Sequence, residues 1–184
     1  MAKATCTMSR TVAWTASLCL ALGFAPAPSA APLGIGRAPT GATLAARVEP
    51  IGRLGAELPA GAGSAATGAK IYAERCAACH GATGREGPDP VLVGGRGTLG
   101  GKEPVQTIGS YWPYATTVFD YIRRAMPFPA PGSLSDDDVY ALTAFLLAAN
   151  GIIGAHDTLD RASLPRVVMP NAQGFDGDPR PDTR

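Results

Sequence analysis

The stretch Cys76-Ala77-Ala78-Cys79-His80 decides what this chain folds around. Its two thiols stand three positions apart, close to one turn of an α-helix, and an imidazole follows the second thiol directly. On such a turn the thiols can add to the two vinyl groups of a haem, and the imidazole can lie under the iron. The stretch therefore predicts one covalent haem c, attached through Cys76 and Cys79, with His80 as an iron ligand.

Zinc sites and redox-active dithiols share parts of this pattern. A structural zinc site needs four ligands, but the other two cysteines, Cys6 and Cys19, lie in an N-terminal segment that we expect to be removed. The only other histidine is His156. A thioredoxin-like dithiol should open a helix after a strand, whereas this pair closes a predicted helix. The pattern thus favours haem over both alternatives.

Residues 1–31 have the three parts of a secretory signal peptide. Lys3 and Arg10 precede an apolar run over 12–25, and small residues follow around Ala30. The alternative is a membrane anchor, but this run is shorter than the roughly 20 residues that a membrane span requires. We therefore expect a periplasmic protein with no membrane span in its mature form.

The balance of charge excludes two classes of partner. The chain has 16 Lys and Arg against 15 Asp and Glu, a formal charge of +1. Without Lys3 and Arg10, 14 basic residues face 15 acidic ones. Such a balance supplies no basic surface for nucleic acid or for an anionic membrane. Partners should be recognised through local patches instead.

The rest of the chain is predicted to be a small all-α domain, 65–151, between two extended segments. Residues 32–64 are rich in Ala, Gly and Pro, and we interpret them as an arm. This arm is either a flexible linker or draped over a partner or over the domain itself. In the second case the contacts would be made by its apolar residues, Leu44, Val48, Ile51, Leu54 and Leu58. Residues 152–184 return to proline, glycine and charge, and form a tail.

Three helices are expected within the domain, over 67–79, 114–125 and 136–149. The middle helix should bury a stripe at Val118, Tyr121, Ile122 and Ala125. The last helix begins after an N-cap at Ser135 and is apolar almost all round, so we expect it to pack against another helix or a cofactor. Three short helices bury little apolar surface by themselves, and a haem would complete their core.

A loop methionine is the best candidate for the sixth ligand of the iron. Met126 lies in Ala-Met-Pro-Phe between the second and third predicted helices, where its sulfur can reach the haem face opposite His80. Met169 and His156 are the alternatives, and either methionine could instead fill a gap in an apolar contact. Methionine ligation leaves no open position on the iron, which suits electron transfer better than catalysis.

The order of CxxCH, the segment Pro90-Val91-Leu92-Val93-Gly94, Met126 and a closing helix resembles the small monohaem cytochromes c of the His/Met kind. The resemblance implies that the carbonyl of Pro90 accepts a hydrogen bond from His80 and that Leu92 packs on the haem. It also implies that the first and last helices cross. The facing residues would then be Gly68 and Tyr72 on one helix and Leu142 and Leu146 on the other.

Two interpretations stay open for the aromatic residues Tyr111 and Trp112. They either line the haem and hydrogen-bond a propionate, or they make ordinary core contacts. Arg123 or Arg124 likewise either pairs with a propionate or makes ordinary surface contacts.

Residues 107–127, with 139–144, 150–153 and 168–171, resemble the cytochrome subunits of bacterial sulfite dehydrogenase and of the sulfane dehydrogenase of thiosulfate oxidation. This resemblance implies an electron-transfer subunit that is not itself an enzyme. It would accept electrons from a molybdenum-cofactor subunit and pass them to another cytochrome c or an oxidase. Many sulfane dehydrogenase cytochromes carry two haem domains, whereas this chain has one CxxCH.

Two other functions remain open. A free-standing soluble periplasmic cytochrome c serving an oxidase would explain the haem equally well, but it would not explain the arm and the tail. A haem enzyme or gas sensor would require that Met126 not bind the iron.

Overall fold

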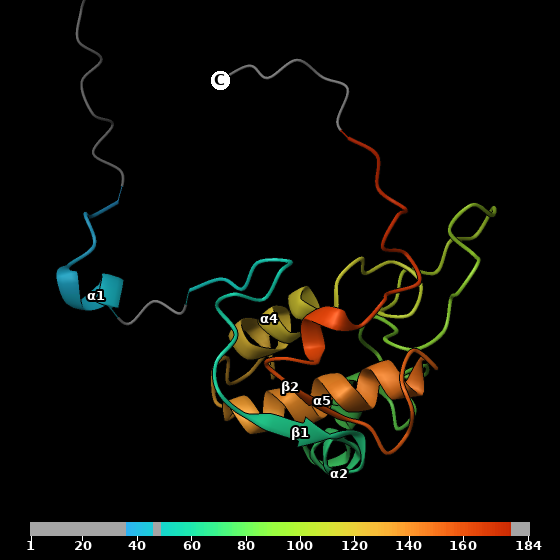
Figure 1. Cartoon of the computed structure of the whole chain (residues 1–184), viewed down its shortest axis with the longest axis horizontal. Coiled ribbons are helices and arrows are strands. Elements are labelled where there is room, and N and C mark those ends of the chain that lie inside the picture. Colours follow the sequence, from blue (N-terminus) through green and yellow to red (C-terminus); the bar gives the residue numbers. More distant parts are fainter. Residues whose placement is uncertain (1–35, 46–48, 178–184) are drawn as a thin grey trace, which may run out of the picture. The chain divides into compact units, whose positions relative to one another are not determined.

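The computed structural model describes residues 36–45 and 49–177 (Figure 1). The predicted signal segment 1–31 lies outside these residues. The chain divides into two units, one up to Ala45 and one from Ala46 onward. In the first unit the structure describes one short helix, α1 (Gly41–Ala45), near whose start the hydroxyl of Thr40 accepts a hydrogen bond from the backbone N–H of Thr43 at 3.1 Å.

The second unit is mostly helical, which confirms the predicted all-α class, and it adds one small antiparallel sheet in which Gly63 pairs with Leu159. Its elements in chain order are β1 (Ala62–Ser64), α2 (Ala65–Arg75), α3 (Ala77–His80), α4 (Ala115–Ala125), α5 (Asp136–Ala149), β2 (Thr158–Asp160) and the 3-10 helix η1 (Leu164–Arg166). Among the described residues, no helix is long and apolar enough to cross a membrane.

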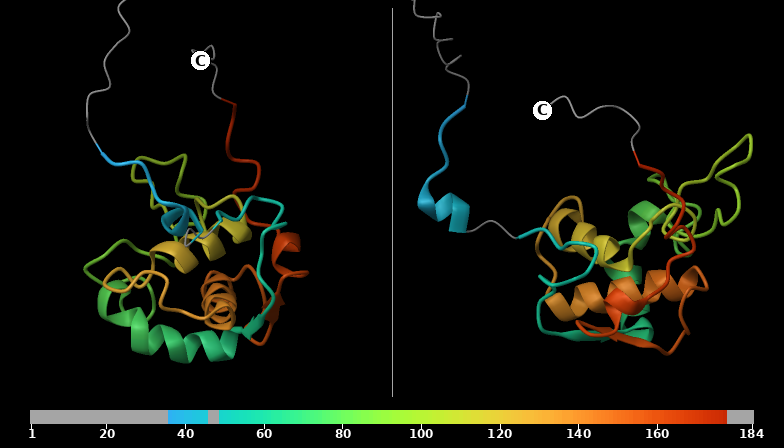
Figure 2. Two further views of the ribbon diagram at one scale, coloured as in Figure 1. Left: turned by 90° about the vertical axis from the view of Figure 1, so that its left-hand side faces the viewer. Right: turned by 45° about the horizontal axis from the view of Figure 1, so that its top comes forward.

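Helix α5 is the central element, with α4 on one side and α2 on the other (Figures 1 and 2). It begins where predicted, because Ser135 and Asp138 form a capping box. The Ser135 hydroxyl accepts from the N–H of Asp138 at 3.2 Å, and the Asp138 carboxylate accepts from the N–H of Ser135 at 3.3 Å. Three aspartates in its first turn also favour the positive end of the helix dipole.

The crossing of α2 and α5 depends on a glycine. A Cβ atom at Gly68 would overlap the backbone carbonyl of Ala141 and lie 2.8 Å from the Cβ of Phe145. The ring of Tyr72 lies 4.9 Å from that of Phe145. The predicted crossing is therefore present, and the closest approach of Gly68 is to Ala141 and Phe145, one position before each of the two leucines expected there. Leu142 and Leu146 are themselves buried.

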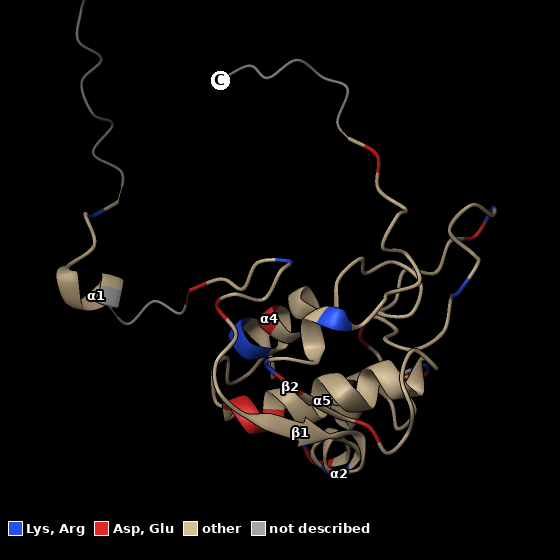
Figure 3. Cartoon of the chain, in the orientation of Figure 1, with Lys and Arg blue, Asp and Glu red and all other residues tan. Residues whose placement is uncertain are grey.

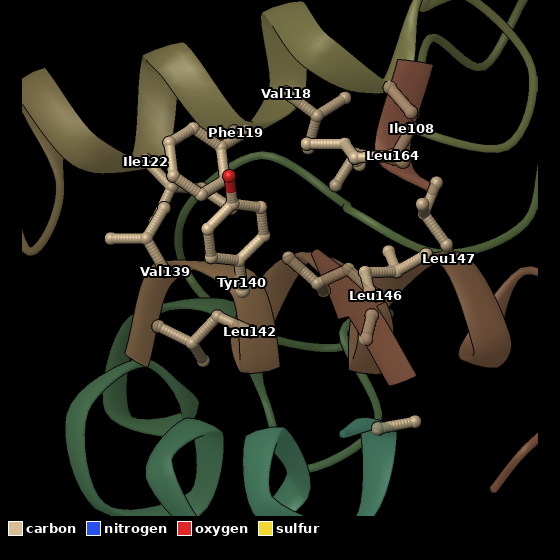
Figure 4. Packing of buried hydrophobic residues seen from close by; sticks show 14 of the residues in the cluster. Ile108, Val118, Phe119, Ile122, Val139, Tyr140, Leu142, Leu146, Leu147 and Leu164 are labelled. Carbon is tan, nitrogen blue, oxygen red and sulfur yellow. The ribbon is translucent and has the colours of Figure 1, made fainter. Parts of the chain in front are cut away.

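The apolar core extends beyond 65–151 on both sides. Figure 4 shows Leu164, from the C-terminal flank, among the core residues of α4 and α5. Besides residues of α4 and α5, it includes Ile51 and Leu58 from the arm, and Leu159, Leu164 and Met169 from the tail. Helices α4 and α5 have apolar faces that the other helices of the domain do not cover. These flanking residues cover them. Within the arm, Ile51 and Leu58 thus pack on the domain, whereas Leu54, which was expected to make the same kind of contact, is 76% exposed.

Hydrogen bonds fix the arm to α4 and α5. The buried Asp120 accepts from the N–H of Ile51 at 3.0 Å, and the hydroxyl of Thr116 donates to the carbonyl of Arg53 at 3.1 Å. On α5, the hydroxyl of Tyr140 donates to the carbonyl of Pro59 at 2.9 Å. These side chains satisfy backbone groups of a segment that has little regular structure.

The buried face of α4 differs from the predicted stripe. Val118 and Ile122 are buried as expected, but Tyr121 is 48% exposed and Ala125 is only half-buried. Phe119 is fully buried instead, and its ring centroid lies 4.5 Å from that of Tyr140. The contact with α5 therefore selects the side of α4 that carries Phe119, next to Val118 and Ile122.

Candidate haem site

The predicted helix over 67–79 is divided at Cys76, and this break shapes the site. Cys76 ends α2, where its N–H donates to the carbonyl of Tyr72 at 2.9 Å. Its own carbonyl accepts from the N–H groups of Cys79 at 3.1 Å and of His80 at 3.0 Å. The two thiols and the imidazole therefore belong to one turn. Cys76 is half-buried, Cys79 is exposed and neither forms a disulfide.

The imidazole of His80 is oriented by a backbone carbonyl. Its Nδ1 lies 2.9 Å from the carbonyl oxygen of Pro90. Because a carbonyl can only accept, Nδ1 must carry the proton, and the lone pair of Nε2 is left free. That is the tautomer required for a metal ligand that binds through Nε2.

The loop that carries Pro90 is held at both ends. On one side, the N–H of Asp89 donates to the carbonyl of Cys79 at 3.0 Å. On the other, the N–H of Leu92 donates to the carbonyl of Gly84 at 2.8 Å. The loop comes so close to α3 that a Cβ atom at Gly87 would overlap the carbonyl of Cys79. A side chain at this glycine would therefore push Pro90 away from His80.

A buried tyrosine supports the same turn. The hydroxyl of Tyr72 donates to the carbonyl of Gly81 at 2.9 Å. Burial, with the nearby Cys76 and Glu86 adding to it, raises the pKa of Tyr72 to about 12. The phenol therefore stays protonated at neutral pH and keeps this hydrogen bond.

Both thiols are unlike those of a redox-active dithiol, whose pKa is lowered. Burial raises the pKa of the Cys76 thiol to about 11, an effect that the nearby Arg75 partly offsets. A hydrogen bond with the Asp89 carboxylate raises the pKa of Cys79. Both groups are therefore neutral thiols at physiological pH. A neutral S–H can add across a vinyl double bond without leaving a buried charge behind.

Several half-buried apolar residues pack against the core without being covered by it. Among them are Cys76 and Ala77 of this turn and, from separate parts of the chain, Leu92, Trp112, Met126 and Leu134. A haem covering them would remove their remaining apolar surface from water. Together with the free Nε2 and two neutral thiols, this donor set fits a covalent haem.

The two methionines occupy different environments. Met126 directly follows α4, where its N–H donates to the carbonyl of Ile122 at 3.1 Å, and its side chain is half-buried. Met169 is 2% exposed within the core. Its environment is that of a residue that fills a gap in an apolar contact. His156, the third candidate, is exposed.

A hydrogen bond joins the loop after Met126 to the helix that precedes the thiols. The Arg75 guanidinium donates to the hydroxyl of Ser133 at 3.0 Å. Ser133, in the segment between α4 and α5, therefore lies beside the end of α2, next to Cys76 in the sequence.

The aromatic candidates separate into two contacts. The ring centroid of Tyr111 lies 5.3 Å from that of Phe175 in the tail, and the carbonyl of Tyr111 accepts from Asn171 at 2.8 Å. The half-buried Trp112 lies 5.7 Å from Tyr121, centroid to centroid. Sequence reasoning missed Tyr121 as the neighbour of Trp112, because helical spacing groups Tyr121 with the buried Val118.

Both arginines considered as propionate partners are engaged with carboxylates of the protein. Arg123 pairs with Asp136 at 2.8 Å, and Arg124 donates through Nε to Asp120 at 2.9 Å. Figure 3 shows that acidic and basic residues are interspersed over the second unit in that view. Within residues 36–45 and 49–177, no group of three or more His, Cys, Asp or Glu side chains is close enough to hold a metal ion, as a zinc site would require.

Comparisons with known proteins match this geometry. The family model of cytochrome c matches residues 65–150. A chain in the crystal structure of the sulfane dehydrogenase SoxCD from Paracoccus pantotrophus is 45% identical, over 83% of this chain and 75% of that chain, with a TM-score of 0.71. A chain of the thiosulfate dehydrogenase TsdBA from Marichromatium purpuratum is 26% identical over 47% of this chain and 18% of that chain, with a TM-score of 0.36. No curated protein matches the sequence significantly.

The similarity to the sulfane dehydrogenase chain covers more of this sequence than the cytochrome c family model does. Residues 65–150 are fewer than half of the 184 in the chain, whereas the structural match covers 83%. The likeness therefore includes residues that flank the cytochrome c segment. Those flanking residues supply Ile51, Leu58, Leu159, Leu164 and Met169 to the core.

Proposed function

Because this chain belongs to the cytochrome c family and therefore carries a covalent haem c, we propose that it is the electron-transfer subunit of a sulfite or sulfane dehydrogenase. The observation that carries the proposal is the 45% identity to a chain of sulfane dehydrogenase SoxCD over 83% of this chain. The catalytic partner would be a molybdenum-cofactor subunit. The electrons would pass onward to another cytochrome c or an oxidase.

The haem ligands in this proposal are His80, through Nε2, and Met126, through its thioether sulfur. Cys76 and Cys79 form the two thioether bonds. The haem supplies a centre that gains and loses one electron at a time. The Pro90 carbonyl holds the His80 ring in the required tautomer and makes it a stronger donor through the hydrogen bond to Nδ1.

The remaining candidate residues exclude water and shape the edge of the site. Leu92 and Trp112, both half-buried, would pack against the haem, and Tyr111 would lie nearer the tail. With Met126 in the sixth position, no site on the iron is open to a substrate. The chain itself would therefore form and break no substrate bonds, and the sulfur chemistry would belong to its partner.

The mature protein would act in the periplasm, after removal of residues 1–31. The composition of that segment supports this location. Residues 32–48 and the end of the tail would be available to contact the catalytic subunit. The domain 65–151 would carry the haem, and the flanking residues 49–64 and 152–177 would complete its core.

The direct test is anaerobic reduction of the haem by substrate. The chain is produced in a haem c-maturing host, either alone or together with a molybdenum-cofactor subunit from the same organism. We expect the two to copurify, and sulfite or a protein-bound sulfane group should reduce the haem in the complex within seconds. The isolated chain, and a complex prepared without molybdenum cofactor, should stay ferric.

The opposite result is equally clear. A monomeric haem protein that binds no molybdenum subunit, and that exchanges electrons only with other cytochromes or an oxidase, would contradict the proposal. It would identify the chain as a free-standing carrier.

A further inference from the structure

Asn150 follows α5 directly and joins this helix to the loop on the histidine side of the site. Its Nδ2 donates to the carbonyl of Leu146 at 2.8 Å and to the carbonyl of Leu92 at 3.2 Å. Its Oδ1 accepts from the N–H of Gly94 at 2.9 Å. One amide group thus uses both of its polar atoms to connect the last turn of α5 to residues 92–94.

The side chain of Asn150 is itself held in place by its surroundings. A Cβ atom at Gly109 would lie 2.8 Å from its Cγ, so the backbone of the 107–110 turn packs directly on the amide. The N–H of Ile108 donates to the carbonyl of Leu92 at 3.2 Å, the same carbonyl that Asn150 contacts. The amide is therefore enclosed between two loops, and only a residue of this shape provides both a donor and an acceptor there.

The segment that Asn150 holds is the one that orients His80. Leu92 stands two residues after Pro90, whose carbonyl contacts His80 Nδ1. The other hydrogen bonds around Pro90, from Asp89 to Cys79 and from Leu92 to Gly84, join loops or the single turn α3. Asn150 supplies a side-chain connection from this segment to α5, the most deeply buried helix of the fold.

We propose that Asn150 is a positioning residue for the haem site. By fixing Leu92 and Gly94 against α5, it sets the position of the Pro90 carbonyl and so the strength of its hydrogen bond to His80. The proposal rests on the assignment of His80 as the proximal ligand made above. It extends that assignment to a residue outside the CxxCH motif that does not contact His80.

The hydrogen bond to Nδ1 affects the balance between the two oxidation states. A stronger hydrogen bond makes the imidazole a better donor, and a better donor favours ferric over ferrous iron. Loosening the Pro90 loop should weaken this bond and therefore raise the reduction potential. It should also expose the His80 Nδ1–H to exchange with solvent.

The test compares Asn150→Ala with a matched control in the full haem-loaded chain. Thr116→Val is the control, because it removes one buried side-chain hydrogen bond to a loop, at Arg53, without changing the volume. Two quantities are measured: the midpoint potential by redox titration, and the exchange rate of the His80 Nδ1 proton by NMR of the reduced protein.

We expect Asn150→Ala to speed exchange of the His80 proton by tenfold or more. The ferrous-to-ferric ratio at a fixed potential should rise by threefold to tenfold, a tenfold change being 59 mV for one electron. Thr116→Val should change neither quantity, although it too lowers stability. Equal effects of the two variants, or no effect of Asn150→Ala on either quantity, would overturn the proposal.

A second variant covers the case in which Asn150→Ala fails to mature. Asn150→Asp is nearly isosteric and keeps the acceptor for Gly94, but it loses both donations to carbonyls. The proton exchange rate is its readout, because the added charge shifts the potential by itself. Faster exchange supports the proposal, and an unchanged rate overturns it.

Failure of the ligand assignment would look different. It would already show in the parent protein as a spectrum without histidine and methionine ligation.

Discussion

Replacing Met126 and Met169 separately with alanine should give two opposite phenotypes. Met126→Ala should remove the sixth ligand, so the ferric protein loses the weak far-red band of a methionine-ligated haem and the ferrous protein gains the ability to bind carbon monoxide. Met169→Ala should leave both properties unchanged, because the Met169 side chain is buried in the apolar core, where it fills space between other side chains.

Met169→Ala should lower the free energy of unfolding more than Met126→Ala does, the reverse of their effects on the haem ligand. Met169 is 2% exposed, and truncation of a buried methionine costs about 2–5 kcal/mol through lost transfer free energy and the cavity that remains. Met126 is half-buried, so the packing contribution lost there is smaller. Denaturant unfolding of the ferric proteins, followed by far-ultraviolet circular dichroism, measures the difference in stability between the two variants. Optical spectra show whether methionine still ligates the iron.

The crossed pattern is what makes this pair informative. Loss of the far-red band in Met169→Ala, with the band intact in Met126→Ala, would assign the ligand to the tail and refute our account of the site. Retention of the band in both variants would mean that neither methionine alone is required as the ligand. General destabilisation of the fold cannot produce loss of the band in the more stable of the two variants.

Three further predictions concern the fold around the site. Gly68→Ala should lower the free energy of unfolding in a denaturant titration, because overpacking against Ala141 costs about 1–3 kcal/mol and exceeds the gain in helix propensity of about 1 kcal/mol; a more stable variant would show that the two helices can separate freely. Leu58→Ala should cost about 2–5 kcal/mol whereas Leu54→Ala should stay within about 0.5 kcal/mol, since the exposed fractions of these arm residues are 2% and 76%; equal effects would mean that the arm does not pack on the domain. Burial raises the pKa of Tyr140 from its ordinary value of 10 to about 12, so the folded state holds the phenol proton more tightly. This pKa difference contributes roughly 2–3 kcal/mol to the free energy of unfolding, at about 1.4 kcal/mol for each pKa unit, and the contribution is intact below pH 10 and lost as the pH rises through 12. Tyr140→Phe should therefore flatten the fall in stability above pH 10. An unchanged slope would contradict the burial of this phenol as the cause.

Local signals in the sequence were sufficient for α5. The capping residue Ser135, the aspartates that follow it and Gly151, which adopts a φ of +66°, all act within a few residues of the ends of the helix. The CxxCH turn is equally local. The predicted start of α5 therefore agrees with the structure, whereas the single helix predicted over 67–79 is divided at Cys76, within the CxxCH turn.

Contacts between distant segments were not predictable in the same way. Strand β1 is Ala-Gly-Ser, which has no alternating pattern, and it is a strand because Gly63 pairs with Leu159. The burial of Ile51 and Leu58 likewise depends on the faces of α4 and α5 that they meet. Composition identified the arm as irregular, but irregular backbone can still be packed when side chains such as Asp120 satisfy its polar groups.

The exposure of Tyr121 could not be predicted from helical spacing. Tyr121 has the spacing of a core residue, yet it is 48% exposed and its ring lies beside that of Trp112. Periodicity gives the approximate apolar face of a helix, and the contact with a neighbouring helix decides which side of that face is buried.

The position of α5 explains how the two proposed ligands, His80 and Met126, can be held together although they come from distant segments. His80 and Met126 are 46 residues apart, and no regular sheet connects them. Each is nevertheless connected to α5 by a short path: His80 through α2 at Gly68 and through the loop at Asn150, and Met126 through α4 and the Arg123–Asp136 ion pair. A site is kept precise when the groups that support its ligands are fixed to rigid elements. A one-electron relay needs nearly the same geometry in both oxidation states, and a single buried helix that supports both ligands is a simple way to provide it.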